Sequence, residues 1–215
     1  MRRIWGWVFL AVFAWFAAHF LHATYWKYSG GDPASFELFL GRQGWLYAHL
    51  FGGALTLVLG LAQLLWTRQR FPRPVHRWVG RVYVLGMFVG CVGAVGLIAT
   101  SPAPASIRVA FAATMLAWVV TAGIAVVAIL RRRVSVHRVW MIRNYLVTLA
   151  PVTFRLLLPA AMAIGIAPSP VLIAGLLWVS WSLPLLVFEG ILRVPGMRAI
   201  GLPSPHPTAS GADAV

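Results

Sequence analysis

Residues 109–130 read VAFAATMLAWVVTAGIAVVAIL and contain no charged side chain. The hydrocarbon core of a bilayer is about 30 Å thick, so a helix that crosses it needs about 20 predominantly apolar residues. This stretch is long enough for one crossing. Five more stretches have the same character: 4–22, 46–66, 82–100, 145–166 and 171–192. The sequence therefore predicts an all-helical, polytopic membrane protein with six transmembrane helices.

The composition of the 215 residues agrees with this prediction. The chain is 60% hydrophobic and only 10% charged, whereas soluble domains carry about 25% charged residues. So few charges cannot cover the surface of a soluble globule of this length. The composition thus excludes a soluble enzyme and a disordered chain. The single cysteine, Cys91, excludes a secreted disulfide scaffold.

The distribution of charge predicts the orientation in the membrane. A net charge of +14 would suit a nucleic-acid partner, but the basic residues lie in short clusters between the apolar stretches. Such clusters mark the cytoplasmic side of membrane proteins. With both termini in the cytoplasm, only Lys27, Arg42 and Arg108 fall outside the membrane on the opposite side. We expect this orientation, with the bilayer and its anionic head groups as partners and no nucleic acid.

The two ends of the chain carry further expectations. Arg2 and Arg3 before the first apolar stretch would suit a signal peptide, but that stretch is long and no A-x-A-like cleavage site follows it. We expect a retained helix. We therefore expect one six-span domain over 1–194. A short cytoplasmic tail, 195–215, follows it, and its Pro-, Ala- and Ser-rich composition predicts disorder.

A weak internal repeat organises the middle of the chain. Residues 68–81 read RQRFPRPVHRWVGR and residues 131–143 read RRRVSVHRVWMIR. Each is an arginine cluster followed by His-Arg, Trp, a further Arg and an apolar stretch. Spans two to five are thus two hairpins, for which we expect a central four-helix bundle flanked by spans one and six.

The repeat brings His76 and His137 to equivalent positions. Pro74 suits a first helical position and Ser135 an N-cap, so each histidine is expected in the first turn of its helix. On diagonal helices, two histidines at one face can ligate a haem iron from both sides. The nearby arginines would then hold the haem propionates: Arg77, Arg81, Arg138 and Arg143. The alternative is anchoring to anionic head groups, which is common for basic residues at cytoplasmic helix ends.

A stripe of small and polar residues follows one side of the second span. The stripe comprises His49, Gly53, Thr56, Gly60 and Gln63. Their spacing of four and three residues places them on one helix face. Such a face packs against other helices in lipid. The alternative is that the stripe also lines a polar cavity, with His49 as its reactive group.

Arg155 lies about ten residues into the fifth span, where insertion of an arginine costs at least about 2.5 kcal/mol. We therefore expect it to face the interior, and either to line a ligand site or to form a structural pair. Pro151 and Pro159 flank it and are expected to bend the helix. Glu189, near the inner end of the last span, is more readily reached by the arginines of the inner loops.

A third group of histidines lies near the opposite face. His19, His22 and His49 have similar expected depths, and three histidines can bind a transition metal. The alternative is a set of isolated interfacial histidines beside an aromatic belt that includes Tyr25 and Trp45.

Four stretches resemble a known family. They are HLFGGALTLVLGLAQ (49–63), HRWVGRVYV (76–84), HRVWMIRNYLVTLAPVTFRL (137–156) and LLWVSWSLPLLVFEGIL (176–192). Together they resemble the bacterial family of predicted membrane proteins called domain of unknown function 2306, over about 45–192. Members often have an Asn in the last span where this chain has 182–185, SLPL. The resemblance implies a multi-span protein of the bacterial inner membrane and brings no established activity.

Three functions are compatible with these patterns, and no motif of a known catalytic site is present. The first is a redox protein that binds b-type haem through His76 and His137 and exchanges electrons with a quinone or a partner subunit. The second is a non-enzymatic protein that binds or transports an anionic ligand or lipid at Arg155. The third is a structural subunit of a membrane complex.

Overall fold

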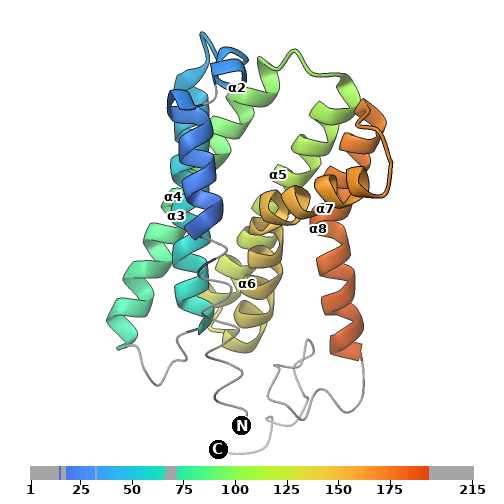
Figure 1. The fold of residues 1–215 in the computed structure, drawn as a ribbon. Coiled ribbons are helices and arrows are strands. Elements are labelled where there is room, and N and C mark those ends of the chain that lie inside the picture. Colours follow the sequence, from blue (N-terminus) through green and yellow to red (C-terminus); the bar gives the residue numbers. More distant parts are fainter. Residues whose placement is uncertain (1–14, 16–17, 32, 66–71, 194–215) are drawn as a thin grey trace, which may run out of the picture. The chain divides into compact units, whose positions relative to one another are not determined.

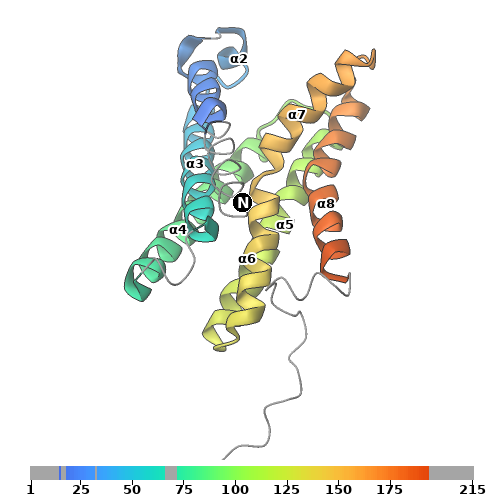
Figure 2. The same cartoon turned by 60° about the horizontal axis from the view of Figure 1, so that its bottom comes forward.

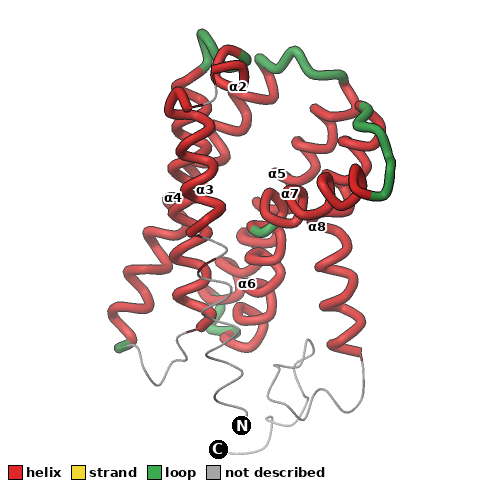
Figure 3. Tube along the Cα trace, in the orientation of Figure 1, coloured by secondary structure: helices red, strands yellow, loops and turns green. Residues whose placement is uncertain are grey.

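The structure is a computed structural model that describes residues 15, 18–31, 33–65 and 72–193. Figure 3 shows helices joined by short loops, and the described part of the chain contains no strand. The prediction of an all-helical fold is therefore confirmed. The chain divides into two compact units, Met1–Thr100 and Ser101–Val215.

The helices follow one another in chain order (Figure 1). In the first unit, residues 18–26 are helical and precede η1 (Lys27–Gly31), α2 (Pro33–Glu37), α3 (Gln43–Leu65) and α4 (Arg73–Ala99). The second unit contains α5 (Ala105–Leu130), α6 (Val134–Thr148), α7 (Ala150–Ala163) and α8 (Pro170–Arg193).

Glycines bring α3 and α4 into backbone contact in the first unit. A Cβ atom at Gly93 of α4 would lie 2.4 Å from the backbone nitrogen of His49, and one at Gly52 of α3 would lie 2.4 Å from that of Gly90. No real Cβ atom fits at such distances, so these positions require glycine. Close approach of backbones is how helices associate in lipid, where water does not drive apolar surfaces together. The α3–α4 pair is the core of the first unit.

In the second unit, α5 packs against α6 and α8, and α7 packs against α8 (Figure 2). The axes of α6 and α7 differ by 43° at the break between them. Pro151 lies in the first turn of α7. Because proline lacks an N–H and its ring crowds the preceding turn, a helix rarely continues straight through it. The expected bend before Arg155 is therefore present, at Leu149.

Four described helices are long and apolar enough to cross a membrane: α3, α4, α5 and α8. The bent pair of α6 and α7 gives a fifth crossing if it forms one span. These five correspond to the predicted spans two to six. The predicted first span, 4–22, lies largely outside the described residues, and the tail, 195–215, lies wholly outside them.

Two helices begin well before the apolar stretches that predicted them. α4 begins at Arg73 and α6 at Val134, whereas the predicted spans began at 82 and 145. Hydropathy detects only the part of a helix that is apolar, but arginine is a good helix former and extends the helix beyond that part. Ser135 is accordingly inside the first turn of α6, and the N-cap is Arg133.

Candidate functional sites

The side chain of His49 in α3 forms a hydrogen bond to α4 within the first unit. Its Nδ1 lies 3.0 Å from the backbone oxygen of Gly90 in α4. The side chain is half-buried where α3 contacts α4. A carbonyl oxygen can only accept, so Nδ1 carries the proton in this bond. In a neutral imidazole, Nε2 is then left as an acceptor with a lone pair.

The rest of the predicted stripe has several different roles. Thr56 is fully buried, and its hydroxyl donates to the carbonyls of Gly52 and Gly53 in its own helix. Gln63 Nε2 donates to the backbone oxygen of His76, 2.9 Å away, so this residue does join α3 to α4. Gly53 does not, because a Cβ atom there would meet nothing within 4 Å. The glycine of α3 that meets α4 is the adjacent Gly52.

His76 lies in the first turn of α4, as expected, and its side chain is exposed. Arg77 and Arg81 are also exposed. The guanidinium carbon of Arg81 lies 4.9 Å from the centre of the Trp78 ring, which is a cation–π contact. These side chains therefore lie on the surface of the first unit.

His137 lies in the first turn of α6 and is half-buried. Its Nδ1 lies 2.9 Å from the backbone oxygen of Ala125 in α5. Because a carbonyl oxygen only accepts, Nδ1 of His137 carries the proton, and Nε2 of the neutral ring has a lone pair that can ligate a metal. Histidine ligands of metals almost always have their other ring nitrogen held in this way. Arg138, the next residue, is exposed.

The guanidinium of Arg143 forms an ion pair with a carboxylate. Its Nε lies 2.6 Å from Glu189 Oε1 and its Nη2 lies 3.1 Å from Glu189 Oε2, which joins α6 to α8. The guanidinium carbon also lies 4.4 Å from the centre of the Trp140 ring. Glu189 thus meets an arginine of the inner repeat, as expected. A haem propionate would have to displace this carboxylate, which makes Arg143 a poor propionate ligand.

Arg155 is not buried among the described residues of the second unit. Its side chain is exposed on α7, and Nη1 donates to the backbone oxygen of Pro151 one turn earlier, 3.3 Å away. Arg155 is therefore on the surface of the second unit, and the expectation that it faces the interior of the protein stays a prediction. The rotation of α7 about its axis depends on contacts with other helices, which the sequence of α7 alone does not contain.

A buried polar network between α5 and α6 was missed by the sequence analysis. Asn144 is fully buried, and its Nδ2 donates to the backbone oxygen of Trp118 at 2.8 Å and to Thr121 Oγ1 at 2.9 Å. Trp118 Nε1 in turn donates to Thr148 Oγ1, 2.8 Å away. Asn144 falls one residue before the predicted fifth span, so it was not considered among residues within the membrane. The Asn-x3-Thr spacing on one helix face was the available signal.

The described residues contain no group of three or more His, Cys, Asp and Glu side chains that could hold a metal ion. His19 and His22 are exposed, and the His19 ring stacks on Trp15 with centroids 5.7 Å apart. The convergence of His19, His22 and His49 on a metal is therefore not seen. These contacts agree with the alternative, in which the histidines are isolated and lie near aromatic rings.

Several long apolar helices, with arginine clusters at their ends, are typical of a polytopic membrane protein. Residues 46–192 match the family described as predicted membrane protein (DUF2306), and the chain belongs to this family. No curated protein and no solved structure is matched by the chain. The family description assigns no activity, so function has to be argued from the residues.

Proposed function

We propose that this membrane protein binds a b-type haem and transfers electrons. The observation that carries the proposal is the hydrogen bond from His137 Nδ1 to the carbonyl of Ala125, at 2.9 Å. This bond leaves a lone pair on Nε2 of the neutral ring, which is the form that ligates haem iron. The imidazole is half-buried between helices, so its orientation is restrained before any ligand binds.

The sequence repeat makes His76 the second ligand of the iron in this proposal. Among the arginines of the repeat, Arg138 is exposed beside His137 and suits a propionate. Arg143 is excluded from that role by its pair with Glu189. A bound haem supplies a one-electron carrier, and a quinone or a partner subunit would be the donor or acceptor. The chain's contribution is to orient the ligands and to place them in the membrane.

The test is the visible absorption spectrum of the purified chain, oxidised and then reduced, from cells supplied with a haem precursor. We expect a Soret band, sharp bands on reduction, and loss of both in His137→Ala and His76→Ala. His22→Ala is the matched control, because His22 is exposed and outside the repeat. A colourless wild-type protein, or a His137→Ala variant with unchanged haem content, would contradict the proposal.

The placement in the membrane is part of the proposal. We infer six spans, with both termini in the cytoplasm, in the inner membrane of a bacterium. Supporting this, four described helices can cross a membrane and a bent pair can add a fifth. The arginine clusters around 68–81 and 131–143 support the cytoplasmic location of these two loops.

A second candidate is binding of an anionic ligand at Arg155. It is favoured by the exposure of a guanidinium on α7, just after the break in a span. Broken helices often carry the binding sites of transporters. Arg155→Ala would then abolish uptake or binding of the ligand, whereas Arg155→Lys would retain part of it. An unchanged spectrum in both variants would separate this role from haem binding.

A further inference from the structure

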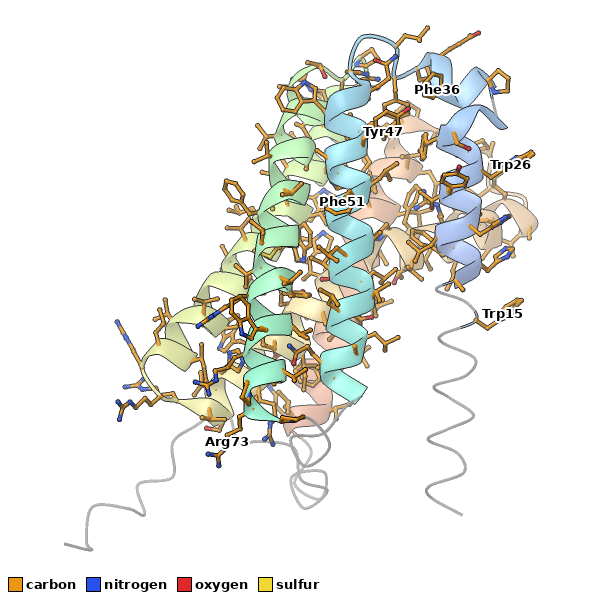
Figure 4. All side chains as sticks on the ribbon, turned by 90° about the vertical axis from the view of Figure 1, so that its left-hand side faces the viewer. Trp15, Trp26, Phe36, Tyr47, Phe51 and Arg73 are labelled. Atoms are coloured by element: carbon orange, nitrogen blue, oxygen red, sulfur yellow. The ribbon has the colours of Figure 1, made fainter. Side chains whose placement is uncertain are left out.

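Three arginines form a row along one side of α4. Arg73, Arg77 and Arg81 are spaced four residues apart, and all three are exposed. Residues with this spacing lie above one another on a helix. Figure 4 shows Arg73 at the first turn of α4, where the row begins. We call these three residues the arginine row.

Within the described part of the chain, no acidic side chain forms an ion pair with the arginine row. α4 contains no Asp or Glu, and the ion pair found among the described residues joins Arg143 to Glu189 in the second unit. The other described acidic residue, Glu37, lies on α2 and is exposed. The row therefore presents three guanidinium groups on one face, and a guanidinium matches a phosphate in charge and in two-point geometry.

The same side of α4 continues as an exposed apolar face. The spacing from Arg81 onward is again four and three residues, and each side chain is at least 42% exposed: Leu85, Phe88, Val92 and Val95. From Arg81 to Val95 this face is about 21 Å long. One leaflet of a bilayer has about 15 Å of hydrocarbon. The opposite side of α4, with Gly86 and Gly93, is the side that contacts α3.

An aromatic ring lies beside the arginine row, between Arg77 and Arg81 in the sequence. Trp78 is 63% exposed and lies under the guanidinium of Arg81. Tryptophan prefers the boundary between head groups and acyl chains. The charged part of this face, with its aromatic ring, is thus followed by apolar surface, in the order in which a phospholipid presents its head group and its acyl chains.

We propose that this face of α4 binds an anionic phospholipid. The phosphate lies on Arg73, Arg77 and Arg81, and an acyl chain lies along Leu85 and Phe88. This site does not include the proposed iron ligands, His76 and His137. It also assigns Arg77 and Arg81 to a lipid phosphate in place of a haem propionate.

The test uses full-length, delipidated protein in a neutral detergent. The probe is phosphatidylglycerol with 16- to 18-carbon chains, and binding is followed by native mass spectrometry and by the rise in unfolding temperature. Phosphatidylcholine controls for net charge, and inorganic phosphate and a short-chain phosphatidylglycerol control for the acyl chains. We expect tight binding of the long-chain anionic lipid alone, weakening as salt is raised.

The decisive variants remove the same charge from two places. R73Q/R77Q/R81Q is expected to weaken phosphatidylglycerol binding by at least about 10-fold, because each basic side chain near the head groups adds to the attraction. R131Q/R132Q/R133Q removes three exposed arginines between α5 and α6. It is expected to change binding by about 2-fold or less, because Arg131, Arg132 and Arg133 are consecutive residues between two helices and do not lie above one another on one helix face. Phe88→Ala should weaken long-chain binding and leave short-chain binding unchanged.

Each outcome decides the proposal. Equal weakening in both triple variants would show diffuse charge attraction and would overturn it, as would no weakening in either. Loss of lipid binding with an unchanged absorption spectrum supports it and leaves the haem proposal intact. Loss of colour with retained lipid binding would assign the row to haem propionates and overturn it. If R73Q/R77Q/R81Q does not accumulate, Arg77→Gln against Arg132→Gln gives the same comparison with single changes.

Discussion

Arg143 and Glu189 join α6 to α8 through two hydrogen bonds, Nε to Oε1 at 2.6 Å and Nη2 to Oε2 at 3.1 Å. The two residues are 46 positions apart in the sequence. The arginine side chain is 14% exposed and that of the glutamate 34%, so solvent screens the pair only in part. The pair also holds the guanidinium over Trp140.

Removing either partner of this ion pair should destabilise the second unit. We expect Glu189→Ala to lower the free energy of unfolding by about 1.5–3 kcal/mol, because Arg143 loses charge-assisted hydrogen bonds. Chemical unfolding in detergent measures the effect. The exposed Glu37→Ala is the control. In a double-mutant cycle with Arg143→Ala, strictly additive effects would show that the two side chains do not interact.

The glycine contacts between α3 and α4 predict a strong contrast between two alanine substitutions. Gly93→Ala puts a Cβ atom 2.4 Å from the His49 nitrogen, whereas Gly53→Ala meets nothing within 4 Å. We expect Gly93→Ala to cost about 1–3 kcal/mol through forced separation of the helices. Gly53→Ala should be neutral or stabilising, since alanine favours the helix by about 0.5–1 kcal/mol. Thermal unfolding of both variants makes the comparison, and similar unfolding temperatures would contradict the packing.

The buried network at Asn144 predicts a loss of stability without a loss of charge. Asn144→Ala removes two hydrogen bonds to α5, to Trp118 and to Thr121. We expect a loss of about 1–2 kcal/mol, the range that model peptides give for polar contacts between membrane helices. Thr114→Val is the control, because the Thr114 hydroxyl bonds only to Ala110 in its own helix. Equal losses in the two variants would contradict a special role for the network.

The orientation in the membrane predicts opposite labelling at the two ends of α5. With Cys91→Ser as background, Ser106→Cys places an exposed thiol in the first turn of α5 and Ser135→Cys places one after its end. A membrane-impermeant maleimide should label Ser106→Cys in intact cells and Ser135→Cys only after lysis. The reverse pattern would place both termini outside the cytoplasm.

Apolar stretches predicted the four long helices α3, α4, α5 and α8, and the bent pair of α6 and α7 as one helix, because long runs without charge have few alternatives to a membrane helix. Contacts between helices were less accessible. Gly52 and Gly53 are adjacent in α3, and which one meets α4 depends on the rotation of both helices, which the sequence of α3 alone does not contain. For the same reason, the side of α7 that carries Arg155 was not predictable.

The hydrogen bonds of the histidines were inaccessible for a different reason. His49 and His137 both bond to backbone carbonyls, those of Gly90 and Ala125. Every residue has such a carbonyl, so the sequence does not indicate which residue accepts the hydrogen bond. Side-chain partners are more informative: Glu189 was expected near an arginine of the inner loops, and Arg143 is that arginine.

The break at Leu149 has a consequence for the thickness of the membrane that this chain can occupy. The apolar part of α6 and α7 lies within 145–166, a stretch that would form a straight rod of about 33 Å. A hydrocarbon core of about 30 Å is shorter than such a rod, and a bend relieves this hydrophobic mismatch. We expect the angle at Leu149 to open in bilayers with longer acyl chains and to close in thinner ones, which makes α6 and α7 a span of adjustable length.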